Sequence, residues 1–234
     1  MTAIFKREFR AYFSSPLGYL IIAAMAVFEG IFFVYMFSAG YAENEFVISS
    51  TLTVVMLAVP VLTMRLFSEE RKQRTDQVLL TSPVSLWGIV AGKFFAALSV
   101  FAISYAPTLI FQIILTTKLE TLNWLYYIGA LFGVLLYGAA LIAICMFISS
   151  LTESQVVAAV VSLVVSLVLY MIDSFAAMTN VKWIMTLAGH LSFMGRYQPF
   201  FAGIINFSSI IFFLSVAFLF VFLTVRVLDK KRWA

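Results

Sequence analysis

Charged side chains are scarce in this sequence. They make up 11% of its 234 residues, while hydrophobic residues make up 63%. A soluble domain usually carries about 25% charged residues, and a soluble chain this apolar could not cover its surface. The sequence therefore predicts an integral membrane protein. Its 25 phenylalanines suit helices that face lipid.

Cysteine and histidine are nearly absent as well. Cys145 is the single cysteine, which excludes an intramolecular disulfide and a cysteine-based metal site. His190 is the single histidine, which argues against histidine-rich metal binding, and we interpret it as a packing or interface residue. We expect no metal or cofactor in this chain. The net charge of +4 does not indicate nucleic-acid binding, because the basic residues follow the membrane topology described below.

Motifs of the common enzyme classes are missing too. The sequence contains no G-x-x-x-x-G-K-[ST] phosphate loop, no H-E-x-x-H and no G-x-S-x-G. We therefore expect a protein without catalytic residues. Six membrane spans in 234 residues would also leave no room for a nucleotide-binding domain.

Long apolar runs define the architecture. A membrane-crossing helix needs about 20 mostly apolar residues, and six segments meet this condition. They are residues 17–39, 47–66, 94–116, 124–149, 156–178 and 204–226. The first segment is too long for a signal-peptide core, so we expect it to be retained. The prediction is an all-α integral membrane protein with one transmembrane domain over residues 1–234.

The basic residues orient these spans. Of the 15 Lys and Arg residues, 12 lie at the N-terminus, in the loop after the second span, or at the C-terminus. Because short cytoplasmic loops are enriched in Lys and Arg, we expect both termini and that loop in the cytoplasm, and a bacterial or archaeal inner membrane as the location. The other three are Lys118, Lys182 and Arg196.

Two further segments are neither spans nor plain loops. Residues 1–15 contain the amphipathic pattern TAIFKREFRAYFS, which predicts a helix on the membrane surface. Pro16 disfavours helical geometry at the residue before it and so separates this helix from the first span. Residues 180–203 are apolar but interrupted by glycine and proline, which predicts short helices that dip into the outer leaflet.

Charge is concentrated in the loop at residues 67–93 and just before it. Residues 65–76 hold seven of the chain's 26 charged side chains. We expect a helix continuing into water from the second span, supported by an acid-first pair of Glu70 with Arg74. A corner at Ser82 and Pro83, with Ser82 as N-cap, would begin a second helix.

A solvated loop obeying the topology rule is the simpler interpretation of this region. That rule requires only bases, however, whereas here acids and bases alternate and an apolar run, Val78 to Leu80, follows. We therefore favour a docking element for a cytoplasmic partner.

The motif SEERKQRTDQVLLTSPVSLWGIVAGKF resembles the loop between spans 2 and 3 of ABC-2 type permeases, the membrane subunits of one class of ABC transporter. Arg74 and Asp76 stand where Gly and Glu are common in that family. KREFRAYFSSPLGYL resembles its N-terminal interfacial helix. GHLSFMGRYQPFFAGIINFSSIIFFLSV is most similar to permeases of the gliding-motility type and their nitrous-oxide-reductase-accessory relatives. Ser208 or Ser209 lies where those relatives often carry an Asp.

The resemblance implies a cytoplasmic coupling helix within residues 67–93, two ABC ATPase subunits that carry ATP and Mg, and a second permease subunit, identical or similar. The membrane lipid would surround them. The residues implied in ATPase coupling are Glu69, Glu70, Arg71, Arg74, Thr75, Val78, Leu79 and Leu80.

Two acids fall within the predicted spans. Glu29 lies near the middle of span 1 and Asp173 near the outer end of span 5. Such groups usually face protein or water, so each is a candidate for a polar path or a subunit interface. Ala158, Ser162 and Ser166 form a small-residue stripe that suits close helix packing, within the subunit or between two permeases.

The leading hypothesis is a permease subunit of an ATP-driven transporter, in particular an exporter. A secondary transporter or channel would be expected to have more buried ionisable groups and broken mid-membrane helices, and the sequence shows few of either. A membrane enzyme and a scaffold for a cytoplasmic machine are further alternatives. The mostly apolar spans favour an amphipathic or lipid-like substrate, which the sequence does not identify.

Overall fold

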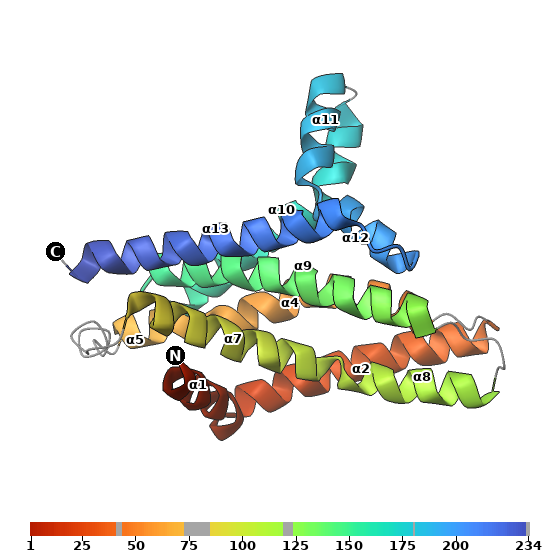
Figure 1. The fold of residues 1–234 in the computed structure, drawn as a ribbon, viewed down its shortest axis with the longest axis horizontal. Helices are drawn as coiled ribbons and strands as arrows, with labels where there is room; N and C mark the ends of the chain where they lie inside the picture. Colours follow the sequence, from red (N-terminus) through yellow and green to blue (C-terminus); the bar gives the residue numbers. More distant parts are fainter. Residues whose placement is uncertain (41–43, 73–84, 119–123, 180, 233–234) are drawn as a thin grey trace.

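The computed structural model describes residues 1–40, 44–72, 85–118, 124–179 and 181–232. These residues form α-helices and no strand, as predicted (Figure 1). The helices are α1 (Thr2–Ser14), α2 (Pro16–Ser38), α3 (Asn44–Ser50), α4 (Leu52–Thr63), α5 (Arg65–Lys72), α7 (Leu86–Ser104), α8 (Ala106–Lys118), α9 (Trp124–Leu151), α10 (Gln155–Thr179), α11 (Lys182–Leu191), α12 (Phe193–Phe201) and α13 (Phe207–Arg232).

Six helical stretches in the described part of the chain are long and apolar enough to cross a membrane. This confirms the predicted number of spans. They are residues 16–38, 52–72, 86–117, 124–151, 155–179 and 207–230. The third begins eight residues earlier than the sequence predicted, because α7 starts at Leu86.

Spans 2 and 3 are interrupted, which the sequence analysis did not predict. Span 3 breaks at Tyr105, two residues before Pro107, whose missing N–H removes a helical hydrogen bond. At the outer end of span 2, α3 ends before Thr51, whose hydroxyl donates to the carbonyl of Ile48 (2.7 Å). The helical backbone bonds from the N–H of Thr51 to Val47 and from the N–H of Val55 to Thr51 are kept there.

The central span, α9, is buried by its neighbours. It packs against α13, α12, α4 and α7. Its glycines allow close approach: a Cβ at Gly133 would lie 2.5 Å from Cβ of Phe200 on α12. Beside this contact, Tyr137 packs edge-on against Phe193 and Tyr197. These aromatic contacts tie the outer helix α12 to the core of the bundle.

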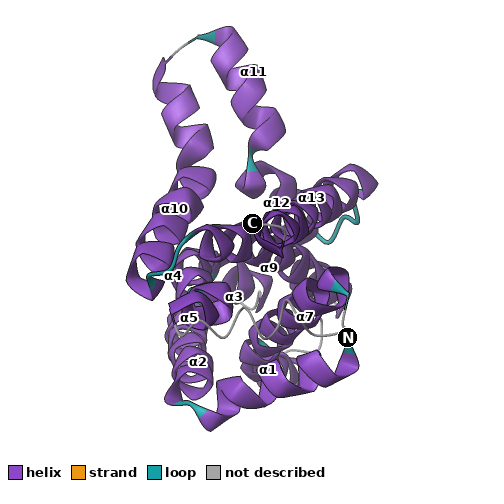
Figure 2. Ribbon diagram, turned by 90° about the vertical axis from the view of Figure 1, so that its left-hand side faces the viewer, coloured by secondary structure: helices purple, strands orange, loops and turns teal. Residues whose placement is uncertain are grey.

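The pair formed by α10 and α11 projects sideways from the bundle (Figure 2). The two helices pack against each other. Where α10 meets the bundle, Ala158, Ser162 and Ser166 are fully buried, and α10 packs there against α4 and α9. The small-residue stripe therefore packs within the chain, and these three side chains do not form an exposed face for a second permease in this arrangement.

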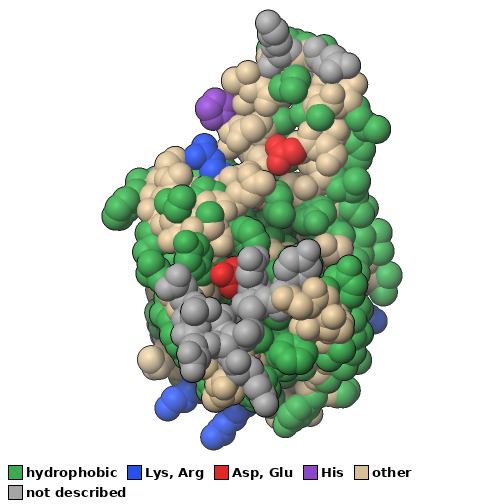
Figure 3. Space-filling view, turned by 90° about the vertical axis from the view of Figure 1, so that its right-hand side faces the viewer, with side chains coloured by type: hydrophobic (Ala, Val, Ile, Leu, Met, Phe, Trp, Pro, Cys, Tyr) green, Lys and Arg blue, Asp and Glu red, His purple; other side chains and the backbone are tan. Residues whose placement is uncertain are grey.

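The two ends of the bundle differ in charge. Both chain termini, α1 and α5 lie toward one end (Figures 1 and 2). The opposite end shows mostly hydrophobic and uncharged side chains, with few acids and bases (Figure 3). At the charged end α1 runs across the bundle and buries its apolar side, with Tyr12 2% exposed. The amphipathic helix is thus present as predicted, at residues 2–14.

Candidate functional site

A buried lysine lies where α1, α5 and α7 meet. Lys93 is only 1% exposed. Its Nζ donates to the carbonyl of Leu66 (2.7 Å) and to Oε1 of Glu70 (2.9 Å), and lies 3.3 Å from Oε1 of Glu8. A buried charge is tolerated only when it is paired and hydrogen-bonded. Lys93 therefore requires all three elements to stay together.

Arg7 completes what we call the charge cluster, made of Arg7, Glu8, Glu70 and Lys93. Its guanidinium donates to Oε1 of Glu8 (2.7 Å) and to Oε1 of Glu70 (3.0 Å). Two acids and two bases thus share one site, with one pair of charges from α1 and one residue each from α5 and α7.

The electrostatics of the charge cluster favour the ionised forms. Burial alone would raise the pKa of the Glu8 carboxyl, but the positive charges of Lys93 and Arg7 outweigh burial and hold that pKa below its ordinary value. The hydrogen bond to Glu8 in turn raises the pKa of the Arg7 guanidinium. The charge cluster lines an open cleft of about 380 Å³ between α1, α5 and α7, so water can reach its edge.

Close packing of α1 on α7 makes these contacts possible. A Cβ at Gly92 would lie 3.0 Å from Cγ2 of Ile4. A larger residue at this position would push α1 away from α7 and would separate Glu8 from Lys93. Gly92 and Lys93 therefore act together, one by its small size and the other by its charge.

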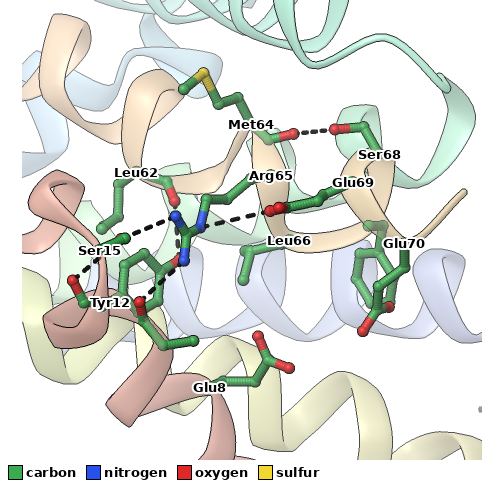
Figure 4. A network of polar contacts seen from close by, with 12 residues as sticks. Glu8, Tyr12, Ser15, Leu62, Met64, Arg65, Leu66, Ser68, Glu69 and Glu70 are labelled. Atoms are coloured by element: carbon green, nitrogen blue, oxygen red, sulfur yellow. Dashed lines mark hydrogen bonds and ion pairs between the residues drawn. The ribbon is translucent and has the colours of Figure 1, made fainter. Parts of the chain in front are cut away.

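A second set of contacts joins α1 to the junction of α4 and α5 (Figure 4). Arg65 donates to the Ser15 hydroxyl (2.9 Å) and the Ala11 carbonyl (3.1 Å). The Tyr12 hydroxyl donates to the Leu62 carbonyl (2.9 Å). Glu69 lies 3.8 Å from Nε of Arg65 and keeps 39% of its side chain exposed. The N-terminal helix is thus fixed to span 2 at two points, Leu62 on α4 and Arg65 on α5.

The other side of α5 is fixed to the end of α9. Arg71 donates to Oε1 of Glu153 (2.9 Å). The Ser149 hydroxyl accepts from the backbone N–H groups of Phe67 and Ser68 (3.3 Å each) and donates to the carbonyl of Met64 (3.0 Å). Serine here satisfies backbone groups at the break between α4 and α5.

Two of the residues expected in water turn inward. The side chains of Glu70 and Arg71 are only 16% and 18% exposed, and both are paired within the chain. That expectation was wrong for them, whereas Glu69 and Lys72 do reach the surface. The helix of span 2 does continue as expected, at least to Lys72.

The rest of the expected coupling region lies outside the described residues: Arg74, Thr75, Val78, Leu79, Leu80 and the corner at Ser82 and Pro83. The following helix begins at Leu86, and its N-cap is Ser85, whose hydroxyl accepts from the N–H of Gly88 (3.2 Å). A cap at Ser82 does not begin this helix.

The sequence analysis gave no role to Lys93 or to Glu8. One signal was available: Glu8 is the single acid of an otherwise basic helix. Lys93 had been placed at a loop end, but α7 begins seven residues before it and carries it into the interior.

The two acids of the spans differ in their partners. Asp173 accepts a hydrogen bond from the Ser192 hydroxyl, which also caps α12 by accepting from the N–H of Gly195 (2.8 Å). Asp173 thus helps to anchor α12. Glu29 is fully buried, and neither of its carboxyl oxygens has a hydrogen-bond partner in the described part of the chain. His190, by contrast, is exposed at the end of α11.

Comparison with protein families gives a match. The sequence model of a family described as ABC-2 family transporter protein matches residues 31–190 of this chain. No curated protein matches it. Among the described residues, no three His, Cys, Asp or Glu side chains are placed to hold a metal ion together.

Proposed function

This chain belongs to the ABC-2 family of transporter proteins, and on that premise we propose that it is the permease subunit of an ATP-driven exporter. The family makes it a multi-pass membrane component of an ABC transporter, and an ABC ATPase is the partner that the family implies in general. The finer assignment, to permeases of the gliding-motility and nitrous-oxide-reductase-accessory type, rests on the sequence resemblance of residues 189–216.

The charge cluster is the observation that carries the proposal. Residues 73–84 connect α5 to α7 in the chain, and both of these helices are tied into the charge cluster by Glu70 and Lys93. Glu8 and Arg7 add α1 to the same unit. A force applied to the loop by a bound ATPase would therefore move α1, span 2 and span 3 together.

The coupling that we propose is thermodynamic. Two ATPase subunits would bind ATP and Mg, and this chain would pair with a second permease, identical or similar. ATP must bind the closed pair of ATPases more tightly than the open pair, because otherwise no equilibrium shifts. Both termini and the charged end of the bundle would lie in the cytoplasm of a bacterial or archaeal cell, consistent with the excess of Lys and Arg there.

Within the coupling region, two roles separate. Glu70 and Arg71 hold α5 in place from within the chain, while Glu69 and Lys72 are available on the surface. We assign docking to the second pair, together with Arg74 and Thr75, and propose that Val78, Leu79 and Leu80 pack into the ATPase.

Charge reversal tests this assignment. We expect Glu69→Lys combined with Lys72→Glu to lower recovery of the ATPase subunit from membranes in mild detergent, while the permease stays folded. Lys230→Glu is the matched control, because Lys230 is exposed near the end of α13, outside the coupling region. Unchanged ATPase recovery and unchanged ATP-dependent transport in the double variant would contradict the docking role.

An ATP-independent transporter or channel is the alternative with an observation in its favour. The two interrupted spans and the buried Glu29 are features that such transporters show. Transport into proteoliposomes that contain this chain without any ATPase would support that alternative. A scaffold for a cytoplasmic machine would instead recover partners but show no transport.

A further inference from the structure

Glu29 lies at about the same depth in the membrane as the helix interruptions at Thr51 and Tyr105. Counting about 1.5 Å per residue, Glu29 is about 20 Å along α2 from its start, and Thr51 and Tyr105 lie at similar distances from Arg65 and Lys93. All three therefore fall at one depth, in the outer half of a hydrocarbon core about 30 Å thick. The interruptions are joined directly, since Oγ1 of Thr51 lies 3.1 Å from the hydroxyl oxygen of Tyr105.

Among the described side chains, no positive charge pairs with Glu29. The carboxyl is 0% exposed and makes no hydrogen bond within the described residues. No described charged side chain acts on it electrostatically. Of the elements packed against α2, α1 and α7 carry their charges toward the other end of the bundle, Glu45 lies at the start of α3, and Lys118 is the last residue of α8. The titratable groups near Glu29 are the phenols of Tyr105 and Tyr127.

The hydroxyl groups around Glu29 have already committed their hydrogens. Thr51 donates to the carbonyl of Ile48 (2.7 Å), so the hydrogen between Thr51 and Tyr105 must come from the phenol. In the same way Thr108 donates to the carbonyl of Tyr105 (2.7 Å), so the Tyr127 phenol donates to Thr108 (3.0 Å). The two phenols therefore present lone pairs, rather than hydrogens, to their surroundings.

These surroundings discriminate between the two forms of the carboxyl group. A carboxylate only accepts hydrogen bonds, while a carboxylic acid also carries one O–H donor. An unpaired carboxylate in an apolar interior is strongly unfavourable, so such a group becomes neutral instead. Because the nearby phenols offer acceptors and no described cation pairs with Glu29, its protonated form is favoured.

We propose that Glu29 is a proton-binding site, held between the interruptions of spans 2 and 3 and emptied when they separate. In the arrangement described here the site holds its proton. When Thr51 and Tyr105 part and water enters, the O–H bond of the acid breaks, its electron pair stays on the carboxylate, and water takes the proton. Return to the closed arrangement reverses the transfer. Proton binding at Glu29 does not require that an ATPase bind residues 73–84.

Infrared spectroscopy of the purified chain in lipid tests the bound proton. We expect a carbonyl band of a protonated carboxylic acid at neutral pH, lost in Glu29→Gln. Glu29→Asp should retain a shifted band, which separates loss of the group from loss of the fold. Asp173→Asn is the matched control and should leave the band unchanged. A wild-type spectrum with the Glu29 signal only among carboxylate bands would overturn the proposal.

Exchange with deuterium tests the release step without any ATPase. Transfer to heavy water shifts the band of a protonated acid only when water reaches it. Tyr105→Phe removes the hydroxyl that joins the interruptions and should speed this shift several-fold. Tyr12→Phe, which removes another buried phenol at the far end of the bundle, should not. Equal rates in Tyr105→Phe and wild type would overturn the role of the interruptions as the barrier to water.

Discussion

The charge cluster and Glu29 are two solutions to the same problem, an acid removed from water. Glu8 keeps its charge, because Arg7 and Lys93 lie 2.7 and 3.3 Å from it and an open cleft adjoins it, and Glu70 pairs with the same two cations. Glu29 has no cation and no hydrogen-bond partner among the described residues. The difference shows that burial alone does not determine the state of an acid, since the neighbouring charges and donors decide it.

The two sites also differ in what they can do. The charge cluster joins three elements and gains from their staying together, which suits transmission of movement. Glu29 has no hydrogen-bond partner among the described residues when Thr51 and Tyr105 are joined. In our proposal its protonation changes only when these two residues separate. The charge cluster is suited to hold three helices together, and Glu29 is suited to gain or lose a proton when helices move.

The largest loss of stability should come from removing the Lys93 cation from the charge cluster. Lys93→Met leaves Glu8 and Glu70 half-buried with Arg7 alone, and breaking a buried ion pair in this way costs about 3–5 kcal/mol of unfolding free energy. Unfolding in mixed detergent micelles measures it. Lys93→Arg keeps the charge and should lose less. Equal stability of the methionine variant and wild type would show that the ion pairs of Lys93 do not stabilise the fold.

A smaller loss is expected when one acid of the charge cluster becomes neutral. Glu70→Gln keeps the shape and leaves two neutral hydrogen bonds in place of two charge-assisted ones, with Glu8 remaining to share the cations, so we expect a loss of about 1–3 kcal/mol in total. Glu69→Gln is the matched neighbour on the exposed side of α5, and surface changes of this kind stay within about 0.5 kcal/mol. The same unfolding measurement compares them, and equal losses would contradict the different roles assigned to these two acids.

Low pH should reduce the stability that Glu8 contributes to the charge cluster. Because the pKa of Glu8 is lower in the fold than its ordinary value of 4.5, the folded state binds fewer protons than the unfolded one as the pH falls below 4.5. The stabilisation from Glu8 is therefore complete above that pH and is lost as the pH falls through the lower, folded value. Melting temperature measured against pH should fall less steeply in Glu8→Gln, and identical slopes would contradict this.

The smallest effect is expected at the exposed end of α5. Glu153 pairs with Arg71, but its side chain is 72% exposed, and exposed ion pairs contribute about 0–1 kcal/mol. Glu153→Gln should therefore melt close to wild type, and added salt should narrow the difference further. A loss as large as that of Lys93→Met would show that exposure is a poor guide to these pairs.

Parts of this fold were predictable because they depend on runs of neighbouring residues. The six spans and the N-terminal helix follow from apolar length and from the amphipathic pattern of residues 2–14. The breaks at Thr51 and Tyr105 were missed, although Pro107 was visible, because a proline in a membrane helix can kink it or interrupt it depending on its neighbours.

The candidate site was predicted in its location and not in its contacts. The concentration of charge after span 2 indicated the charged end, but Glu70 was expected in water and paired with Arg74. The structure instead pairs it with Arg7 and Lys93, which are 63 and 23 residues away in sequence. The docking roles of Glu69 and of residues 73–84 stay predictions.

The sequence by itself determined that this is a multi-pass helical membrane protein with one charged end, because hydropathy and charge add up locally along the chain. Only the tertiary structure decided which acids are paired. Glu8 and Glu70 meet Lys93 because α1, α5 and α7 converge, whereas Glu29 pairs with no cation among the described side chains. The physical reason is distance: electrostatic pairing depends on separation in space, which a linear pattern does not contain.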